Sequence, residues 1–375
     1  MRFPEFSGEW EEHTLSEYLE FKNGLNPDAK RIGSGLPFIS VMDILSEGVI
    51  NYDNIRGKVN ATEKEIECFG VKDGDLLFQR SSETLEDVGR ANVYMDNRTA
   101  IYGGFVIRGR KIGNYDPLFF KYLLATPLAR KRTCRMGAGA QHFNIGQEGL
   151  SKISLYFPSI EEQRKIAEFL SLIDERIATQ NKIIEDLKKL KSAISLKMLH
   201  SDSWEQFKIQ DIASIGRGRV ISSVEISQQE NPLYPVYSSQ TSNDGIMGYL
   251  DDFMFEGEYI SWTTDGANAG TVFYRNGKFN CTNVCGLLKL KKGFDAHFVS
   301  LVLAEATRMY VSTNLANPKL MNNTMGNIQI RLPKLEEQKR ISVVFRKLHG
   351  LLETHNSLII KYSKQKQYLL SQMFI

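Results

Sequence analysis

Two long stretches of the chain share one hydrophobic pattern, in which apolar side chains recur at alternating steps of four and three residues. This spacing is typical of the a/d seam of a coiled coil. The first seam comprises Ile166, Leu170, Ile173, Ile177, Gln180, Ile184, Leu187, Lys191, Ile194 and Met198. A shift of 175 residues gives the second seam, Ile341, Phe345, Leu348, Leu352, His355, Ile359, Tyr362, Lys366, Leu369 and Met373. All ten positions agree in character, including a polar fifth position and a lysine at the eighth, so the pattern predicts a tandem duplication.

Each stretch is predicted to be one long helix. Before the first seam, Pro158 is followed by Glu161 and Glu162. Before the second seam, Pro333 is followed by Glu336 and Glu337. A proline suits a first helical turn, and early carboxylates complement the positive end of the helix dipole. The first stretch has no glycine or proline from about residue 159 to residue 199, so a rod of about 60 Å is expected. The second continues from residue 334 to the C-terminus.

So narrow an apolar stripe needs a partner helix, and the matching seam is the obvious candidate. An antiparallel pairing about a pseudo-two-fold axis would place Gln180 near His355, or Ile184 near Ile359. It would also bring Lys191 and Lys366 toward acidic residues of the other helix, with Asp174, Glu175 and Glu353 available. Alternatively, these lysines extend past the seam into water. The sequence alone leaves parallel and antiparallel pairing open.

The segments before the helices repeat more loosely. Trp10, Glu11, Leu15 and Gly24 correspond to Trp204, Glu205, Ile209 and Gly218, and a short amphipathic helix recurs at residues 119–124 and 298–303. Between them lie short runs rich in Val, Ile, Tyr and Phe with glycine and asparagine at their ends, which indicates strands and turns. We therefore predict an α/β (α+β) fold with mostly antiparallel sheets. Globular domains at 1–157 and 201–332 would alternate with helices at 158–200 and 333–375, and of the two directions we expect these helices to pair as an antiparallel coiled coil.

Composition narrows the class of protein. The chain has 375 residues, of which 42% are hydrophobic and 24% charged, as in ordinary globular proteins. No stretch is long and apolar enough for a membrane helix and the N-terminus has no apolar signal core, so a cytoplasmic protein is expected. The four cysteines suggest no disulfide framework. A net charge of +3 means that any nucleic-acid surface must be local.

Catalytic and metal-binding motifs are not evident. Asn231, Pro232, Leu233 and Tyr234 depart from the Asn-Pro-Pro-Tyr signature of amino methyltransferases by losing the second proline, and a turn is the simpler interpretation. No phosphate-binding loop or complete dinucleotide fingerprint occurs, and the histidines lack metal-ligand spacing. We expect no catalytic site, metal or cofactor in this chain.

The order of parts resembles the specificity (S) subunit of a type I restriction-modification enzyme. The residues that carry the resemblance are Phe3, Pro4, Phe6 and Gly8 with Trp10 to Asn26; Val71, Gly74, Asp75, Leu76 and Leu77; Phe157, Pro158, Glu161, Glu162, Gln163 and Ile166; and Leu332, Pro333, Glu336, Glu337, Gln338 and Ile341. The resemblance covers essentially the whole chain.

The resemblance implies a non-catalytic, DNA-binding subunit. Each target recognition domain would read one half of a bipartite site in double-stranded DNA, and the spacer helices would set the gap and dock methyltransferase (M) subunits, two in number. Restriction (R) subunits would join through the M subunits. Adenine methylation and site-specific DNA cleavage would reside in these partners, together with S-adenosylmethionine, ATP and Mg²⁺. The alternative is a structural adaptor that binds proteins through its globular domains and its coiled coil.

Candidate DNA contacts are polar and basic loop residues, because Arg and Lys contact phosphates while Gln and Asn read base edges. In the first domain they are Gln79, Arg80, Ser81, Ser82, Arg90, Arg130, Lys131, Arg132, Arg135, Gln141, His142 and Asn144. In the second domain they are Arg217, Arg219, Ser238, Ser239, Gln240, Thr241, Ser242, Asn243, Thr263, Thr264, Asn268, Asn314, Asn317, Lys319, Asn322 and Asn323. Complementing a helix C-terminus or forming a turn would also account for many of them.

Overall fold

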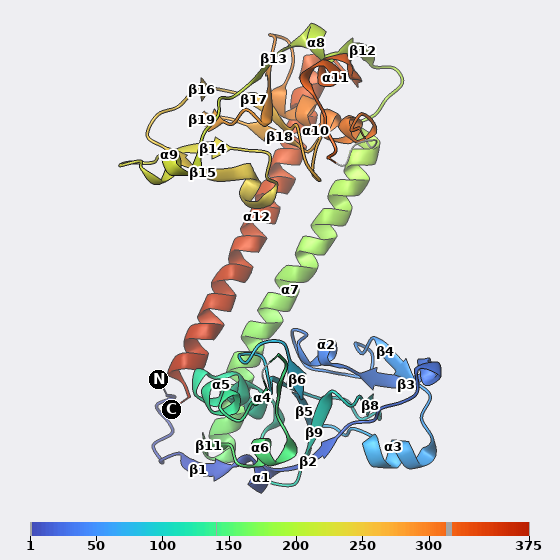
Figure 1. Ribbon diagram of the computed structural model, residues 1–375, viewed down its shortest axis with the longest axis vertical. Helices are drawn as coiled ribbons and strands as arrows, with labels where there is room; N and C mark the ends of the chain where they lie inside the picture. The colour runs from blue at the N-terminus through green and yellow to red at the C-terminus, as the bar shows by residue number, and fades with distance from the viewer. Residues whose placement is uncertain (1, 140, 313–316, 375) are drawn as a thin grey trace. The chain divides into compact units, whose positions relative to one another are not determined.

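The computed structural model describes residues 2–139, 141–312 and 317–374. They form two compact units (Figure 1). Unit 1 comprises Met1–Lys182 with Asn356–Ile375, and unit 2 comprises Ile183–His355. The two long helices are α7 (Ile160–Met198) and α12 (Leu335–Gln372), and each contributes a part to both units.

Unit 1 contains a four-stranded antiparallel sheet in the order β2-β9-β5-β7 and a three-stranded sheet in the order β4-β3-β8. In the latter, β3 runs antiparallel to β4 and parallel to β8. Two further pairs are β1-β11 and β10-β6. The strands are β1 (Glu11–Thr14), β2 (Leu19–Asn23), β3 (Ile32–Ile39), β4 (Gly57–Val59), β5 (Leu76–Gln79), β6 (Ser81–Ser82), β7 (Ala91–Val93), β8 (Ile101–Tyr102), β9 (Val106–Lys111), β10 (Phe143–Asn144) and β11 (Ser154–Phe157).

Unit 2 has a similar topology, with a fourth strand in its second sheet. Its sheets have the orders β13-β20-β17-β18 and β15-β14-β19-β16, and β12 pairs with β21. As in unit 1, the second sheet combines an antiparallel pair, β14 with β15, and a parallel pair, β14 with β19. The strands are β12 (Glu205–Lys208), β13 (Ala213–Arg217), β14 (Tyr234–Tyr237), β15 (Ile246–Leu250), β16 (Phe255–Glu256), β17 (Tyr259–Thr263), β18 (Val272–Arg275), β19 (Lys278–Cys281), β20 (Cys285–Leu290) and β21 (Gln329–Leu332).

The shorter helices lie at the ends of strands and against the sheets. In unit 1 they are α1 (Leu15–Tyr18), η1 (Ala29–Arg31), α2 (Val41–Ile44), α3 (Glu63–Phe69), α4 (Pro117–Ala125), α5 (Pro127–Cys134) and α6 (Gln147–Ser151). In unit 2 they are α8 (Ile209–Ile212), α9 (Ser223–Ser227), η2 (Ser242–Gly245), α10 (Ala296–Ala306), η3 (Thr307–Met309) and α11 (Asn322–Asn327). Helices α4 and α10 confirm the predicted pair of short amphipathic helices.

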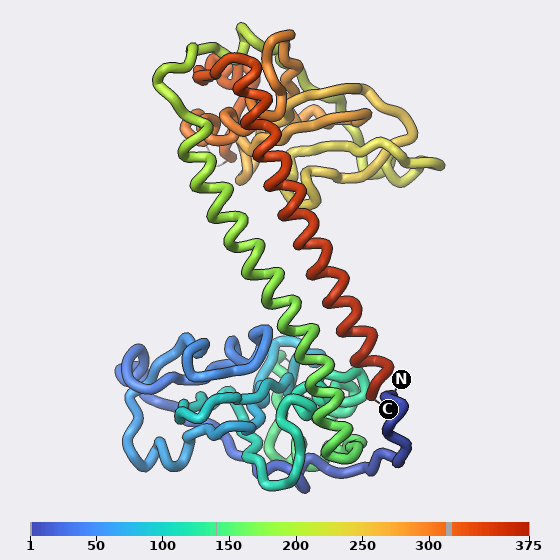
Figure 2. Tube along the Cα trace, turned by 180° about the vertical axis from the view of Figure 1, so that it is seen from behind, coloured from blue at the N-terminus to red at the C-terminus, as the bar shows by residue number. Residues whose placement is uncertain are grey.

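Within unit 1, the beginning of α7 lies beside the end of α12 (Figure 2). Ile166, Leu170 and Ile173 from α7 share one core with Leu369 and Met373 at the end of the second helix. The domain's own aromatic side chains complete that core, because the ring of Phe119 in α4 stacks on Phe374 at a centroid distance of 5.5 Å. The two helices therefore run antiparallel in this unit, which settles the question that the sequence left open.

Unit 2 has the corresponding arrangement. Its core joins Ile194, Met198 and Leu199 at the end of α7 to Ile341 and Phe345 at the beginning of α12. A Trp–Phe ring pair occupies the same place in both cores. The centroids of Trp10 and Phe119 are 6.1 Å apart in unit 1, and those of Trp204 and Phe298 are 5.8 Å apart in unit 2.

A buried glutamine fixes the start of each long helix to its domain. In unit 1, Gln163 donates from Nε2 to the Pro158 carbonyl (3.0 Å) and accepts at Oε1 from the backbone N–H of Asp116 (3.0 Å). Asp116 in turn caps α4 by accepting from the Phe119 N–H (2.8 Å). We call this arrangement the glutamine clamp; it satisfies backbone groups that would otherwise be buried unpaired.

Unit 2 contains the same clamp. Gln338 donates to the Pro333 carbonyl (2.8 Å) and accepts from the N–H of Asp295 (3.0 Å). Asp295 caps α10 by accepting from the Phe298 N–H (2.7 Å). Gln163 and Gln338 expose only 2% and 1% of their surface. The duplication thus extends from the apolar seam to the polar contacts that orient each helix.

Every predicted seam position is buried or half-buried, whereas residues between them are mostly exposed. The predicted contact of Lys366 with an acidic residue is confirmed, because its Nζ lies 2.5 Å from Asp174 Oδ1. The described residues show no ion pair for Lys191, which leaves the alternative that it extends past the seam, and Glu353 lies beside His349 (3.3 Å). His349 stands where the repeat has Asp174. The alignment of Gln180 with His355, or of Ile184 with Ile359, joins residues of different units and stays a prediction.

Candidate nucleic-acid interface

In the first domain, two distant predicted segments meet in a small sheet. Strand β10 pairs with β6, so that Asn144 lies opposite Ser81 and Phe143 opposite Ser82. The Ser81 hydroxyl donates to Asn144 Oδ1 (2.5 Å), and Asn144 Nδ2 donates to the His142 carbonyl (3.2 Å). Asn144 and the adjacent Gln141 and His142 are exposed. The structure thus brings polar groups from residues 79–82 and from residues 141–144 onto one edge of this small sheet. We call it the Ser81–Asn144 edge.

A glycine shapes the turn that precedes this edge. Gly139 has φ of +145°, and a Cβ built there would lie 1.9 Å from the His142 carbonyl oxygen. Backbone bonds in both directions join Ala138 to Asn144 (3.0 and 2.9 Å). Only glycine fits so close a backbone approach at this φ, so the turn has a structural requirement for it.

Several predicted side chains of the first domain are engaged within the domain. Gln79 is buried and donates to the Ser81 carbonyl (2.9 Å). Arg130 is half-buried, and its Nη2 donates to the carbonyls of Glu86 (2.9 Å) and Val88 (2.6 Å). Burial lowers the pKa of the Arg130 guanidinium from its usual value. Arg132 is held by Glu12 Oε1 (2.7 Å). These side chains support the loops, while Lys131 and Arg132 also lie in the last turn of α5, where positive charge complements the helix C-terminus.

The other arginine and lysine side chains that were predicted to contact DNA in this domain are more accessible. Arg80 donates to the Gly104 carbonyl (3.3 Å), and Arg90 is exposed and pairs with Asp87 (2.7 Å). The predicted Ser82, in contrast, is buried. Lys131 and Arg135 are exposed at the last turn of α5 and just beyond it. Positive charge in the described part of this region is thus offered chiefly by Arg90, Lys131 and Arg135.

In the second domain, the loop between β14 and β15 meets the loop after β17. Asn268 Nδ2 donates to the Thr241 hydroxyl (3.1 Å), and the Thr263 hydroxyl donates to the Asn268 carbonyl. Thr263 and Thr264 are themselves buried, whereas Ser242, Asn243 and Asn268 are exposed. Ser238, Ser239 and Gln240 are half-buried, and Gln240 Nε2 donates to the Ile246 carbonyl (2.5 Å).

A buried arginine that sequence reasoning missed holds this loop. Arg275 donates from Nη1 to Asp244 Oδ2 (2.6 Å) and from Nη2 to the Asp244 carbonyl (2.8 Å). Its guanidinium carbon lies 3.7 Å from the ring centroid of Tyr237. Asn243 and Asp244 both have positive φ, 49° and 52°, which non-glycine residues rarely adopt without local support. Arg275 supplies that support from a strand 31 residues away, so no local pattern could have revealed it.

The other predicted residues of the second domain lie apart from that loop or are paired. Arg217 donates from Nε to Asn322 Oδ1 (3.0 Å), Lys319 pairs with Asp265 (3.5 Å), and Arg219 pairs with Glu225. Asn317 and Asn323 are exposed. Asn314 lies outside the described residues.

Residues 7–189 and 201–361 match the type I restriction modification DNA specificity domain, once in each half of the chain. The chain belongs to this family. A putative type I specificity subunit of Mycoplasma pneumoniae is 36% identical over 233 residues, which cover 60% of this chain and 97% of that protein. The type I restriction enzyme MpnII specificity subunit from the same organism is 41% identical over 177 residues, 46% of this chain and 53% of that protein.

Solved structures share the specificity-subunit fold. The crystal structure of the S subunit of a type I restriction-modification system from M. genitalium aligns with a TM-score of 0.69 at 17% identity, covering 98% of this chain and 96% of that one. A chain from a structural study of complex assembly and conformational transition of the type I R-M system aligns with a TM-score of 0.56 at 14% identity, with 97% of each chain covered. These alignments confirm the predicted two-domain fold with two long helices.

The described residues of this specificity-domain protein contain no cluster of three or more His, Cys, Asp or Glu side chains arranged to hold a metal ion. None of their helices is long and apolar enough to cross a membrane.

Proposed function

We propose that this protein is the sequence-specific DNA-binding specificity subunit of a type I restriction-modification complex, and that each domain reads one half of a bipartite site. The observation that carries the proposal is a contrast between the repeats. Both domains share strand order, the Trp–Phe pair and the glutamine clamp. The side chains on their loops differ, in contrast: the edge that pairs Ser81 with Asn144 in one domain pairs Asp265 with Lys319 in the other, where the buried Arg275 also holds a loop.

Shared scaffolds whose loops carry different side chains suit two modules that read different bases. Gln141 and Asn144 carry amides, the groups that would pair with base edges in the major groove; in the second domain Asn243 and Asn268 carry the same group and Ser242 a hydroxyl. The exposed cations Arg90, Lys131 and Arg135 would position the first domain on phosphates. The buried Gln79, Thr263 and Thr264 and the half-buried Arg130 would act by holding the loops.

The helices would serve as the spacer between the half-sites. A helix of 39 residues is about 58 Å long, whereas two major-groove segments one turn apart on one face of DNA are about 34 Å apart. We further propose that exposed faces of α7 and α12 dock two methyltransferase subunits, through which restriction subunits join. Methyl transfer and cleavage, with S-adenosylmethionine, ATP and Mg²⁺, would then belong to those partners.

Salt-dependent DNA binding tests the proposal. The chain, purified with its methyltransferase subunit, should retain duplex DNA with an affinity that falls steeply as salt rises, because phosphate contacts release counterions. Lys131→Ala should reduce the slope of log affinity against log salt by about 1, whereas Lys64→Ala, an exposed lysine on α3, should leave it unchanged. Salt-independent protein binding without DNA retention would favour the adaptor instead. DNA cutting by the chain alone with Mg²⁺ would contradict the assignment of catalysis to partners.

A further inference from the structure

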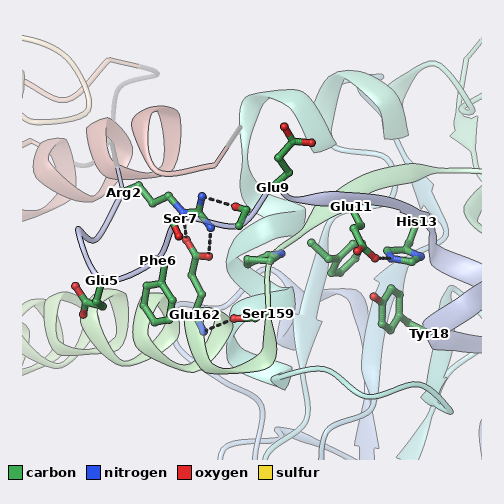
Figure 3. A pocket seen from close by; sticks show the side chains of 13 residues that line it. Arg2, Glu5, Phe6, Ser7, Glu9, Glu11, His13, Tyr18, Ser159 and Glu162 are labelled. Atoms are coloured by element: carbon green, nitrogen blue, oxygen red, sulfur yellow. Dashed lines mark hydrogen bonds and ion pairs between the residues drawn. The ribbon is translucent and has the colours of Figure 1, made fainter.

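A cleft lies at the same place in both repeats, where each long helix begins. In unit 1 the chain's own N-terminal segment, residues 2–8, forms one wall of it (Figure 3). Arg2 from this segment donates to both carboxylate oxygens of Glu162, from Nε to Oε1 (2.7 Å) and from Nη2 to Oε2 (2.6 Å). Phe3 packs edge-on against Phe169 of α7 at 5.9 Å, and Glu5 pairs with Lys165 (3.4 Å).

This segment, which we call the N-terminal strap, buries Glu162 almost completely, leaving 1% of the residue exposed. A carboxylate so buried needs a hydrogen-bonded cation, and the two-pronged guanidinium contact provides one with defined geometry. The strap therefore recognises the start of α7 through one arginine and the aromatic residues that follow it.

In unit 2 no described segment takes the place of the strap in the corresponding cleft. The chain passes from the end of α7 at Met198 to β12 at Glu205, and no counterpart of residues 2–8 exists in so short a connection. The cleft has a volume of about 470 Å³ and is lined by Trp204, Phe207, Phe294, Leu332 and Glu337, among others. Glu337 stands where the repeat has Glu162. Its side chain is exposed, and it forms no ion pair with any described residue.

We propose that this cleft at the start of α12 binds a segment of a partner protein that presents an arginine followed by aromatic residues. The duplication supplies the template for the charged contact, because unit 1 places an arginine against the matching acidic residue, and the cleft in unit 2 offers its own aromatic wall. The arginine would form a paired contact with Glu337, and an aromatic side chain would lie against Trp204 or Phe207. This assignment is independent of DNA recognition.

A peptide copy of the strap tests the proposal on the whole chain. A labelled peptide with the sequence of residues 2–8, capped at both ends, is titrated with the protein and followed by fluorescence anisotropy. Saturable binding at one site is expected. E337Q should weaken it by at least about tenfold through loss of the charged partner. E336Q, which alters the exposed neighbour outside the cleft, should leave it unchanged, and replacing the peptide's arginine by glutamine should match E337Q.

Three outcomes would overturn the proposal. One is no saturable binding up to about 1 mM peptide, where even a weak site would register. A second is sensitivity to E162Q instead of E337Q, because the peptide would then be exchanging with the strap in unit 1. The third is a dimer in sedimentation that requires both Arg2 and Glu337, because a second copy of this chain would then be the occupant.

Discussion

Lys366, near the end of α12, places its Nζ 2.5 Å from Oδ1 of Asp174, in the first half of α7. The other oxygen of that carboxylate accepts from the hydroxyl of Tyr122 in α4 (2.8 Å). One carboxylate thus joins both long helices to the domain of unit 1. Burial, followed by the charge of Asp174, raises the pKa of Tyr122 well above its usual value, so the phenol stays a hydrogen-bond donor.

We predict that Asp174 and Lys366 are energetically coupled. In a double-mutant cycle with D174N and K366M, the coupling in unfolding free energy should be about 0.5–2 kcal/mol, because both side chains are largely shielded from water. E175Q, one residue along and exposed, should show no coupling to Lys366. Additivity of D174N and K366M within about 0.3 kcal/mol in urea denaturation would show that the pair contributes nothing.

The glutamine clamps should contribute to stability at both helix starts. Q163L and Q338L each leave a buried proline carbonyl and a buried aspartate N–H without their partner, and each should lower the unfolding free energy by about 1–3 kcal/mol. Q365L, on the exposed face of α12, serves as the matched control and should change it little. Thermal or urea unfolding measures the effect. Equal stability of Q163L and Q365L would disprove the role of the clamp.

His297 should make unit 2 less stable in mild acid. Burial, followed by the charge of Arg346, lowers the pKa of its imidazole to about 4, below the ordinary value of about 6.5. The unfolded chain therefore binds a proton between these pH values that the folded chain does not, and stability falls as pH decreases from about 6.5 to about 4. The contribution should be on the order of 1–2 kcal/mol.

The measurement compares the wild type with H297Q by urea unfolding at several pH values. Since carboxylates also titrate toward the lower end of this range, the difference between the two proteins isolates the histidine. The wild type should lose more stability than H297Q over this interval. Parallel pH profiles would show that His297 titrates normally in the folded protein.

The seam and the helices were predictable because their signal is periodic and local. Each seam residue lies three or four positions from the next, so burial at all of them followed from the sequence. Helix direction did not follow from the periodicity, because it depends on contacts such as Lys366 with Asp174, 192 residues apart. The two alternatives for Lys191 were open for the same reason, since the answer depends on the partner helix, where His349 stands in place of the repeat's Asp174.

The candidate interface was only partly predictable. Residue type suggested Ser81 and Asn144 separately, but their pairing spans 63 residues. Residue type also suggested Gln79 and Arg130, but Gln79 is buried, Arg130 is half-buried, and both donate to carbonyl groups within the domain. Arg275 carried no signal as a loop anchor, since its sequence neighbours resemble any strand. Loop supports are built from long-range contacts, and these follow only from the three-dimensional fold.

The spacer role makes a separate prediction. Inserting one helical turn of about four residues between Ile177 and Leu187 should change the number of unread base pairs in the target and leave both half-sites as they were. The readout is the methylated motif of cells that express the variant with the methyltransferase subunit. A motif with altered half-sites and the original gap would contradict the spacer role.

The central claim is that two dissimilar loop sets on one duplicated scaffold read a split DNA site. Sequencing of methylated bases across the genome of cells that carry this protein with its methyltransferase subunit tests it most directly. We predict a motif of two short specific segments separated by a gap of fixed length, with substitutions at Asn144 altering one segment only. A contiguous motif, or methylation unaffected by removing this chain, would contradict the account.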